Sequence, residues 1–322
     1  MISELREEGW PRRVWPDHIP ERRGKVPVRS HQLRATWVNH ATVLVQVHGL
    51  NVLTDPVFSP AAGPLGQLGP RRRALPGLHW VDLPPIDLVL LSHNHYDHLD
   101  LPTLMKLWHR DRPRLYTGLG TGEILRRNGI PADAIVELDW WQSAEHAAGV
   151  VVSAAEVRHF SGRGLFDRDR TLWVGLHLKT PSGSVYFGGD SGFGPHYAET
   201  YRRLGAPDLA LLPIGAFLPR SVMRAVHVDP AEAVMAHQQL GARHSLGIHW
   251  GTFSLGADGY ERPVVELERA RRAAGLADDT FVTLQHGDSV EIGESLVRIP
   301  GLAVGAAVRR LDPRPAVSGS GA

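Results

Sequence analysis

The segment His93-Asn94-His95-Tyr96-Asp97-His98 places three imidazoles and one carboxylate within six residues. It directly follows the mostly apolar run 86–92, which is short and branched and therefore predicts a buried strand. An open α/β sheet places its ligands where strands end, so this order constrains both the fold and the chemistry. One metal ion needs about three or four such ligands. The segment predicts a metal site and leaves open whether other segments complete a second one.

Composition narrows the chemistry of this site. The chain has 322 residues, which is enough for one large core or two small domains. It contains no cysteine, which excludes disulfides, thiolate zinc ligands and a cysteine nucleophile and leaves His, Asp and Glu as metal ligands. The formal net charge of +1 creates no global field for nucleic acid, so no nucleic-acid partner is expected.

Three parts of the chain are expected: an N-terminal arm over 1–30, a folded domain over 31–298 and a C-terminal tail over 299–322. The arm is charged and contains proline, and it lacks the apolar core of a secretory signal peptide. No uninterrupted apolar stretch of about 18 residues occurs, so no transmembrane helix is expected. We therefore expect a cytoplasmic protein, with peripheral membrane contact as an open alternative. The sequence does not predict an oligomeric state.

Strand and helix patterns alternate along the expected domain and predict one layered α/β fold. The expected strands are 36–38, 42–47, 51–54, 86–92, 115–117, 150–157, 172–179, 184–187, 209–212, 245–248 and 281–284. The expected helices are 102–110, 122–128, 197–204, 230–240 and 261–274. Residues 56–85 carry many prolines and glycines and are expected to form a long loop, which in a compact domain is usually functional or disordered.

Position separates candidate ligands from the other histidines, of which the chain has 18 in all. Besides the cluster at 93–98, His159, Asp190 and His249 also follow expected strands. If those strands lie side by side, these side chains converge at one edge of the sheet. Taken singly, each of the three is more often an ordinary histidine or a turn aspartate. Their shared position after strands predicts that they complete the metal site.

The order His-x-His-x-Asp-His, followed by His, Asp and His at strand ends, resembles the metallo-β-lactamase superfamily. The resemblance implies an α/β fold, a four-layered αβ/βα sandwich, with a two-metal site at one edge. Seven residues are the ligands that it implies: His93, His95 and His159 for the first ion, Asp97, His98 and His249 for the second, and Asp190 between them. Iron-binding members of the superfamily commonly carry a carboxylate at the position of His95, so the resemblance implies two zinc ions per chain, with mixed or other metals as open alternatives.

Further segments resemble the N-acylphosphatidylethanolamine-hydrolysing phospholipase D family within this superfamily. They occur in the family's order at 37–42, 53–56, 69–71, 213–216, 227–233, 248–253 and 286–288. The resemblance implies a zinc-dependent phosphodiesterase with a phospholipid or other phosphodiester substrate. Such an enzyme hydrolyses N-acylphosphatidylethanolamine-like lipids to N-acylethanolamine and phosphatidate through a hydroxide that bridges the metals. Asp97 and His227 are its expected catalytic residues.

Several residues outside the ligand set have two interpretations. His227 is expected to act as a general acid or phosphate contact, or it only neighbours the helix start at Asp229. His286 is a weaker candidate for the same substrate contacts. Arg71 would bind a phosphate head group or an anionic membrane surface, unless its arginine run is only a solvated charge cluster. Asp55 and His40 are expected to support ligand histidines, or to be ordinary turn residues.

Other functions fit the same ligands. The main alternative is a lactonase acting on a sugar-phosphate lactone, or another metal-dependent hydrolase. A nuclease is disfavoured by the near-neutral charge. A metal-binding protein without turnover is disfavoured by the full ligand set, because a catalytic site keeps positions open for water.

Overall fold

The structure is a computed structural model of the chain and describes residues 26–293 and 295–301. Most of the arm expected over 1–30 and most of the tail expected over 299–322 lie outside the described residues. The last described strand ends at Ile299, one residue beyond the expected end of the domain.

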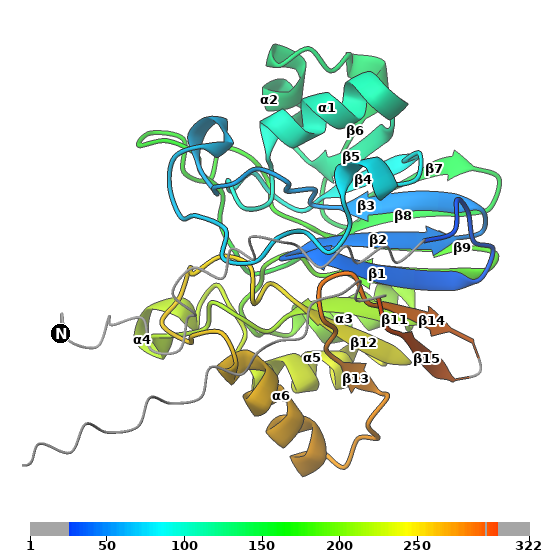
Figure 1. Cartoon of the computed structure of the whole chain (residues 1–322), viewed down its shortest axis with the longest axis vertical. Helices are drawn as coiled ribbons and strands as arrows, with labels where there is room; N and C mark the ends of the chain where they lie inside the picture. The colour runs from blue at the N-terminus through cyan, green and yellow to red at the C-terminus, as the bar shows by residue number, and fades with distance from the viewer. Residues whose placement is uncertain (1–25, 294, 302–322) are drawn as a thin grey trace, which may run out of the picture.

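Two mixed β-sheets form the centre of the molecule (Figure 1). The first has the strand order β15-β14-β1-β2-β3-β4-β5-β6 and the second β13-β12-β11-β10-β9-β8-β7. The strands of the first sheet are β1 (Leu33–Asn39), β2 (Thr42–Val47), β3 (Leu50–Thr54), β4 (Leu88–Leu91), β5 (Arg114–Gly118), β6 (Ile135–Leu138), β14 (Ser289–Ile292) and β15 (Leu296–Ile299). Those of the second are β7 (Ser143–Ala147), β8 (Val150–Ala155), β9 (Gly175–Thr180), β10 (Gly183–Phe187), β11 (Leu209–Pro213), β12 (His244–Ile248) and β13 (Phe281–Val282).

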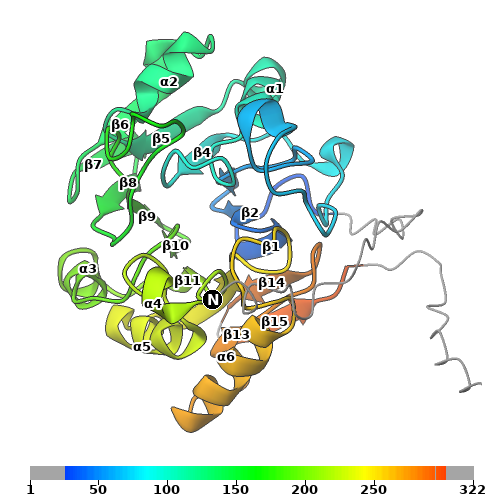
Figure 2. The same ribbon diagram turned by 90° about the vertical axis from the view of Figure 1, so that its left-hand side faces the viewer.

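Helices cover the outer faces of the two sheets (Figures 1 and 2). The first sheet carries α1 (Leu101–Asp111) and α2 (Thr121–Arg127), and the second carries α3 (His196–Leu204), α5 (Pro230–Leu240) and α6 (Arg262–Ala273). Buried side chains from both sheets share one apolar cluster, and a second cluster joins α1 to the first sheet. The four-layered αβ/βα sandwich is therefore confirmed.

Local signals in the sequence explain several element ends. The turn at His48-Gly49 joins β2 to β3, and both residues have positive φ values of 54° and 77°, as a two-residue hairpin turn requires. Asp229 caps α5 in a full capping box with Glu232, and Pro230 occupies the first turn. The strand expected over 172–179 begins only at Gly175, because the backbone N–H groups of Leu172 and Val174 donate to Leu119 and Ser92 instead.

Four strands and one α-helix of the described residues were not predicted: β6, β7, β14, β15 and the short helix α4 (Arg220–Met223). β7 is an edge strand with an alternating exposed and half-buried pattern and only alanine as its apolar residue, so it lacks the apolar signal of a core strand. β15 is also an edge strand, and its two central residues are exposed. The strand expected over 281–284 is only two residues long.

The segment 56–85 contains no strand longer than an isolated bridge and only two short 3-10 turns, η2 (Pro64–Gly66) and η3 (Trp80–Asp82). It crosses the edge of the sheets beside α1 (Figure 1). Across the described ranges 26–293 and 295–301, no helix has the length and apolar character needed to cross a bilayer.

Candidate metal centre

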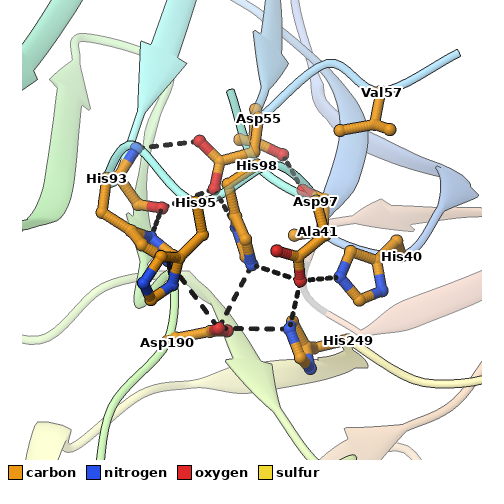
Figure 3. Close-up of polar contacts among 12 residues, drawn as sticks. His40, Ala41, Asp55, Val57, His93, His95, Asp97, His98, Asp190 and His249 are labelled. Atoms are coloured by element: carbon orange, nitrogen blue, oxygen red, sulfur yellow. Dashed lines mark hydrogen bonds and ion pairs between the residues drawn. The ribbon is translucent and has the colours of Figure 1, made fainter. Parts of the chain in front are cut away.

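The predicted ligand residues meet at one edge of the two sheets (Figure 3). The segment 93–98 follows β4 of the first sheet, whereas His159, Asp190 and His249 follow β8, β10 and β12 of the second. Each sheet therefore supplies about half of the cluster. The convergence expected from the positions after strands is what the structure shows.

A first group consists of His93, His95 and His159. The Nε2 atom of His93 lies 2.9 Å from Nδ1 of His95, and Nε2 of His159 lies 3.2 Å from the same atom. Burial lowers the pKa of His93 and of His159 well below the ordinary value, so both rings are neutral at neutral pH. Neutral imidazoles whose nitrogen atoms face one another are the arrangement that a metal ion uses.

A second group surrounds the carboxylate of Asp97. Its Oδ2 atom lies 3.3 Å from Nε2 of His98, 3.4 Å from Nε2 of His249 and 3.0 Å from Nε2 of His40. His40 was expected only to support a ligand, yet its ring lies within the group. Burial lowers its pKa to about 3, and this effect is increased by the nearby His249.

Asp190 lies between the two groups. Its Oδ2 atom is 3.1 Å from Nε2 of His249 and 3.2 Å from Nε2 of His98, and it is 3.7 Å from Nε2 of His159. The preceding Gly189 has a φ of +55°, and a Cβ atom there would lie 2.5 Å from the side chain of Ser92. Glycine therefore lets the end of β10 approach the end of β4, which places this carboxylate at the centre.

Asp55, at the end of β3, fixes the orientation of His98. Its Oδ2 atom lies 2.6 Å from Nδ1 of His98, and its Oδ1 atom accepts a hydrogen bond of 2.8 Å from the backbone N–H of Ser92. With Nδ1 held by Asp55, the Nε2 atom of His98 points toward Asp97 and Asp190. The placement agrees with the support expected of Asp55.

The remaining predicted residues lie around the centre. The His227 ring lies 5.2 Å from the His159 ring and 5.4 Å from the His249 ring, measured between centroids. His286 lies behind His40: its Nε2 atom is 3.1 Å from Oγ1 of Thr252, which accepts the backbone N–H of His40. Arg71 is exposed on the long loop, in an isolated bridge with Ala61.

Arg163 was not among the predicted residues, yet it stabilises the ligand segment. Its Nη1 atom donates to the backbone carbonyls of Asn94 and Leu99, each at 2.8 Å. Its guanidinium also lies 3.9 Å from the centroid of the Tyr96 ring. The signal available was the motif Gly162-Arg163-Gly164 soon after His159, which marks a close backbone approach beside the centre.

The donor atoms at this edge fit divalent metal ions. Several buried atoms there have no hydrogen-bond partner: Nε2 of His98, both ring nitrogens of His249 and Oδ1 of Asp190. Buried polar atoms are normally paired, so unpaired ones that converge are suited to hold a metal ion. The set consists of imidazole nitrogen and carboxylate oxygen, which suits zinc and related divalent ions.

Comparison with known proteins agrees with the fold and the site. Residues 50–250 match the Beta-lactamase superfamily domain. An uncharacterised protein of Mycobacterium tuberculosis is 40% identical over 241 residues, which are 74% of this chain and 64% of that protein. The chain thus spans less than two thirds of the length of this relative.

Two further relatives carry descriptive names. N-acyl-phosphatidylethanolamine-hydrolyzing phospholipase D 1 of Caenorhabditis elegans is 35% identical over 274 residues, covering 81% of this chain and 76% of the nematode protein. A metal-dependent hydrolase of Nitratidesulfovibrio vulgaris is 29% identical over 273 residues, which are 82% of this chain and 97% of that protein.

Among solved structures, a metallo hydrolase from Ignicoccus hospitalis superposes with a TM-score of 0.61 at 20% identity, covering 81% of this chain and 99% of that one. This likeness concerns the fold. The chain has the metallo-β-lactamase fold. It belongs to the metallo-β-lactamase superfamily and, within it, to the family of the N-acyl-phosphatidylethanolamine-hydrolysing phospholipases D.

Proposed function

We propose that the chain is a dinuclear zinc phosphodiesterase of the phospholipase D type that cleaves N-acylphosphatidylethanolamine-like lipids into N-acylethanolamine and phosphatidate. The observation that carries the proposal is the position of Asp190, whose carboxylate lies within hydrogen-bond distance of His98 and His249 and faces the first histidine group. The nematode relative, named for this reaction, supports the choice of substrate class.

In this proposal the two groups hold one ion each. His93, His95 and His159 would hold the first ion, Asp97, His98 and His249 would hold the second, and Asp190 would be available to both. Bound divalent ions would polarise the phosphodiester and make a water molecule more acidic. The chain itself holds these ligands in place from both sheets, and buried walls around them strengthen every charge interaction at the centre.

His227 is proposed to contact the substrate phosphate. Its side chain is 8% exposed, and burial lowers its pKa to about 4. The imidazole is therefore neutral at neutral pH and can donate one N–H to a phosphate oxygen. This favours the phosphate contact over the general acid among the two roles that the sequence left open.

The test uses the purified full chain loaded with zinc. It is incubated with N-acylphosphatidylethanolamine dispersed in non-ionic detergent, and both products are measured by mass spectrometry while metal content is determined in parallel. Release of N-acylethanolamine and phosphatidate is expected. A sample that holds two zinc ions per chain and forms neither product would contradict the lipid assignment. Turnover of a sugar-phosphate lactone in the same assay would instead favour the lactonase.

The variant Asp190→Asn tests the shared ligand. Asparagine keeps the shape of aspartate but lacks its charge, so metal content should fall and turnover should drop at least about a hundredfold. Asp133→Asn is the matched control, because Asp133 is exposed. A variant at position 190 that keeps both ions and full activity would disprove the shared role.

A further inference from the structure

We propose that two protruding loops beside the metal centre form a docking surface for an anionic phospholipid bilayer. The first is the loop 160–171, which follows His159. At its tip Leu165 is 91% exposed and Phe166 is 89% exposed. Scattered exposed apolar side chains are ordinary, but adjacent leucine and phenylalanine side chains that are almost fully exposed indicate an interaction surface.

The tip is held in shape by its own hydrogen bonds. The carboxylate of Asp167 accepts the backbone N–H of Gly164 at 2.7 Å and that of Arg163 at 3.0 Å. At the base of the loop, the backbone N–H of Asp169 donates to the carbonyl of Ser161 at 2.9 Å. These bonds order the loop without burying its apolar side chains. An ordered tip loses little further conformational freedom on binding, which favours association.

A second apolar tip lies on the long loop. Leu65 is 80% exposed and Leu68 is 63% exposed. Backbone hydrogen bonds also close this tip. The N–H of Gly66 donates to the carbonyl of Gly63 at 2.9 Å, and the N–H of Ala61 donates to the carbonyl of Gly66 at 3.1 Å. The two loops therefore present four exposed apolar side chains on closed turns.

The two loops are attached to adjacent residues, Leu99 and Asp100, which directly follow the ligand His98. Arg163 donates to the carbonyl of Leu99 at 2.8 Å. On the other loop, the hydroxyl of Ser59 donates to the carboxylate of Asp100 at 2.8 Å. The two loops therefore flank the ligand segment, and in Figure 1 the blue loop after β3 and the green loop after β8 both extend to the left of the strands.

Charge around the tips fits anionic head groups. Arg71, Arg168 and Arg170 are exposed on the two loops. The acidic groups between them are Asp167, which the backbone of the loop holds, and Asp169, which lies 3.5 Å from the guanidinium of Arg168. Among the charged residues of 59–73 and 160–171 that are exposed, three are arginines and one is an aspartate, so this surface carries a net positive charge. Apolar tips surrounded by arginine are typical of proteins that insert into the interface of a bilayer.

A bilayer explains these tips better than a folded protein partner. A standard protein interface buries roughly 800 Å² per partner on a continuous surface. Here the apolar side chains sit on two separate projections, which can enter the head-group layer to a depth of about 5–10 Å. The link to lipid substrate rests on the proposed function, because docking would hold the metal centre against the membrane that contains the substrate. Membrane binding itself can be measured without turnover.

The test is cosedimentation of the full chain with sucrose-loaded vesicles of phosphatidylcholine and phosphatidylglycerol. The wild type should pellet with these vesicles, and the double variant Leu165→Asp/Phe166→Asp should lower the apparent affinity at least about tenfold. Arg170→Glu should weaken binding by roughly fivefold, and added salt should weaken wild-type binding. Val265→Asp is the matched control, because Val265 is 55% exposed on α6, which lies at the bottom of Figure 1 whereas both loops lie at the upper left.

A wild type that does not pellet, or a double variant that binds as well as the wild type, would overturn the docking surface. A concentration-dependent dimer in light scattering that Leu165→Asp/Phe166→Asp abolishes, without vesicle binding, would assign the tips to a second copy instead. Thermal unfolding, together with turnover of a water-soluble phosphodiester, verifies that the double variant is folded. Vesicle binding without phospholipid turnover would refute the proposed function and leave the docking surface standing.

Discussion

The Nε2 atom of His40 lies 3.0 Å from Oδ2 of Asp97, although the two residues are 57 positions apart in the sequence. The His40 ring also lies 4.1 Å from the His249 ring, and the carbonyl of His40 accepts the backbone N–H of His249 at 3.0 Å. His40 follows β1 of the first sheet, whereas His249 follows β12 of the second. One residue therefore links a carboxylate and a histidine of the second group across the two sheets.

His40→Ala should weaken the second metal position more than the first. Removing a group that orients a ligand typically costs about 10–100-fold in metal affinity or activity. The measurement is metal content and turnover at limiting zinc. His109→Ala, in the exposed last turn of α1, is the control. Unchanged zinc affinity in the His40 variant would show that Asp97 is held by other groups.

Asp55→Asn tests whether a buried carboxylate positions His98. Asparagine has only one oxygen that can accept from His98 and Ser92. Its NH₂ group would face a hydrogen-bond donor of one of these two residues. We expect metal affinity to fall by about 10–100-fold and the protein to lose roughly 1–3 kcal/mol of unfolding free energy. Urea unfolding and a zinc competition titration measure the two effects. A stable variant with normal zinc affinity would contradict this.

Arg71 and Arg72 are neighbours with opposite expected behaviour. Arg72 is 5% exposed, and its Nη2 and Nε atoms donate to the carbonyls of Val57 at 2.9 Å and Ser59 at 3.2 Å. Arg72→Ala should therefore cost about 2–4 kcal/mol of stability, whereas Arg71→Ala should leave stability unchanged. Thermal or urea unfolding compares the pair. If Arg71→Ala raises KM for the phosphodiester without unfolding the protein, the substrate contact expected of this residue is supported.

Acid should destabilise the fold partly through His177 in β9. Burial lowers the pKa of this histidine to about 4 from 6.5. Between these values the unfolded chain binds a proton that the folded chain does not, so the unfolding free energy falls as pH falls, by up to roughly 3 kcal/mol from this residue. In the variant His177→Leu, the unfolding free energy should fall less steeply between neutral and acidic pH, because this residue no longer contributes. Urea unfolding at about pH 7.5 and about pH 4.5 measures it. Equal pH slopes for the variant and the wild type would refute the assignment.

The sequence predicted the core of the fold and the cluster because both depend on local order. Apolar runs marked the buried strands, and ligand-type residues came directly after them at His93, His159 and Asp190. The pairing of His40 with Asp97 depends instead on β1 and β4 running in the same direction and ending at one edge of the first sheet, which no local pattern encodes. Edge strands such as β7 also escaped prediction, because half-exposed positions need no apolar alternation.

The arginines at 71–73 show that local sequence also fails to predict which single residue is buried. Arg71 and Arg72 have the same composition around them, yet one is exposed and the other is buried among backbone carbonyls. Burial of a charged residue depends on which carbonyls the long loop turns toward it, and that is a tertiary property.

The ligand cluster is divided between the two sheets, so metal binding depends on the two halves of the sandwich being docked against each other. His93 to His98 belong to one half of the sandwich, and His159, Asp190 and His249 belong to the other. An ion held by both halves binds only when the halves are docked, so metal in excess favours the docked state by mass action. Removing the metal with a chelator should first weaken the packing between the two sheets at the edge that carries the ligands. Hydrogen exchange at the ends of β4 and β12 would then rise before exchange in the outer helices.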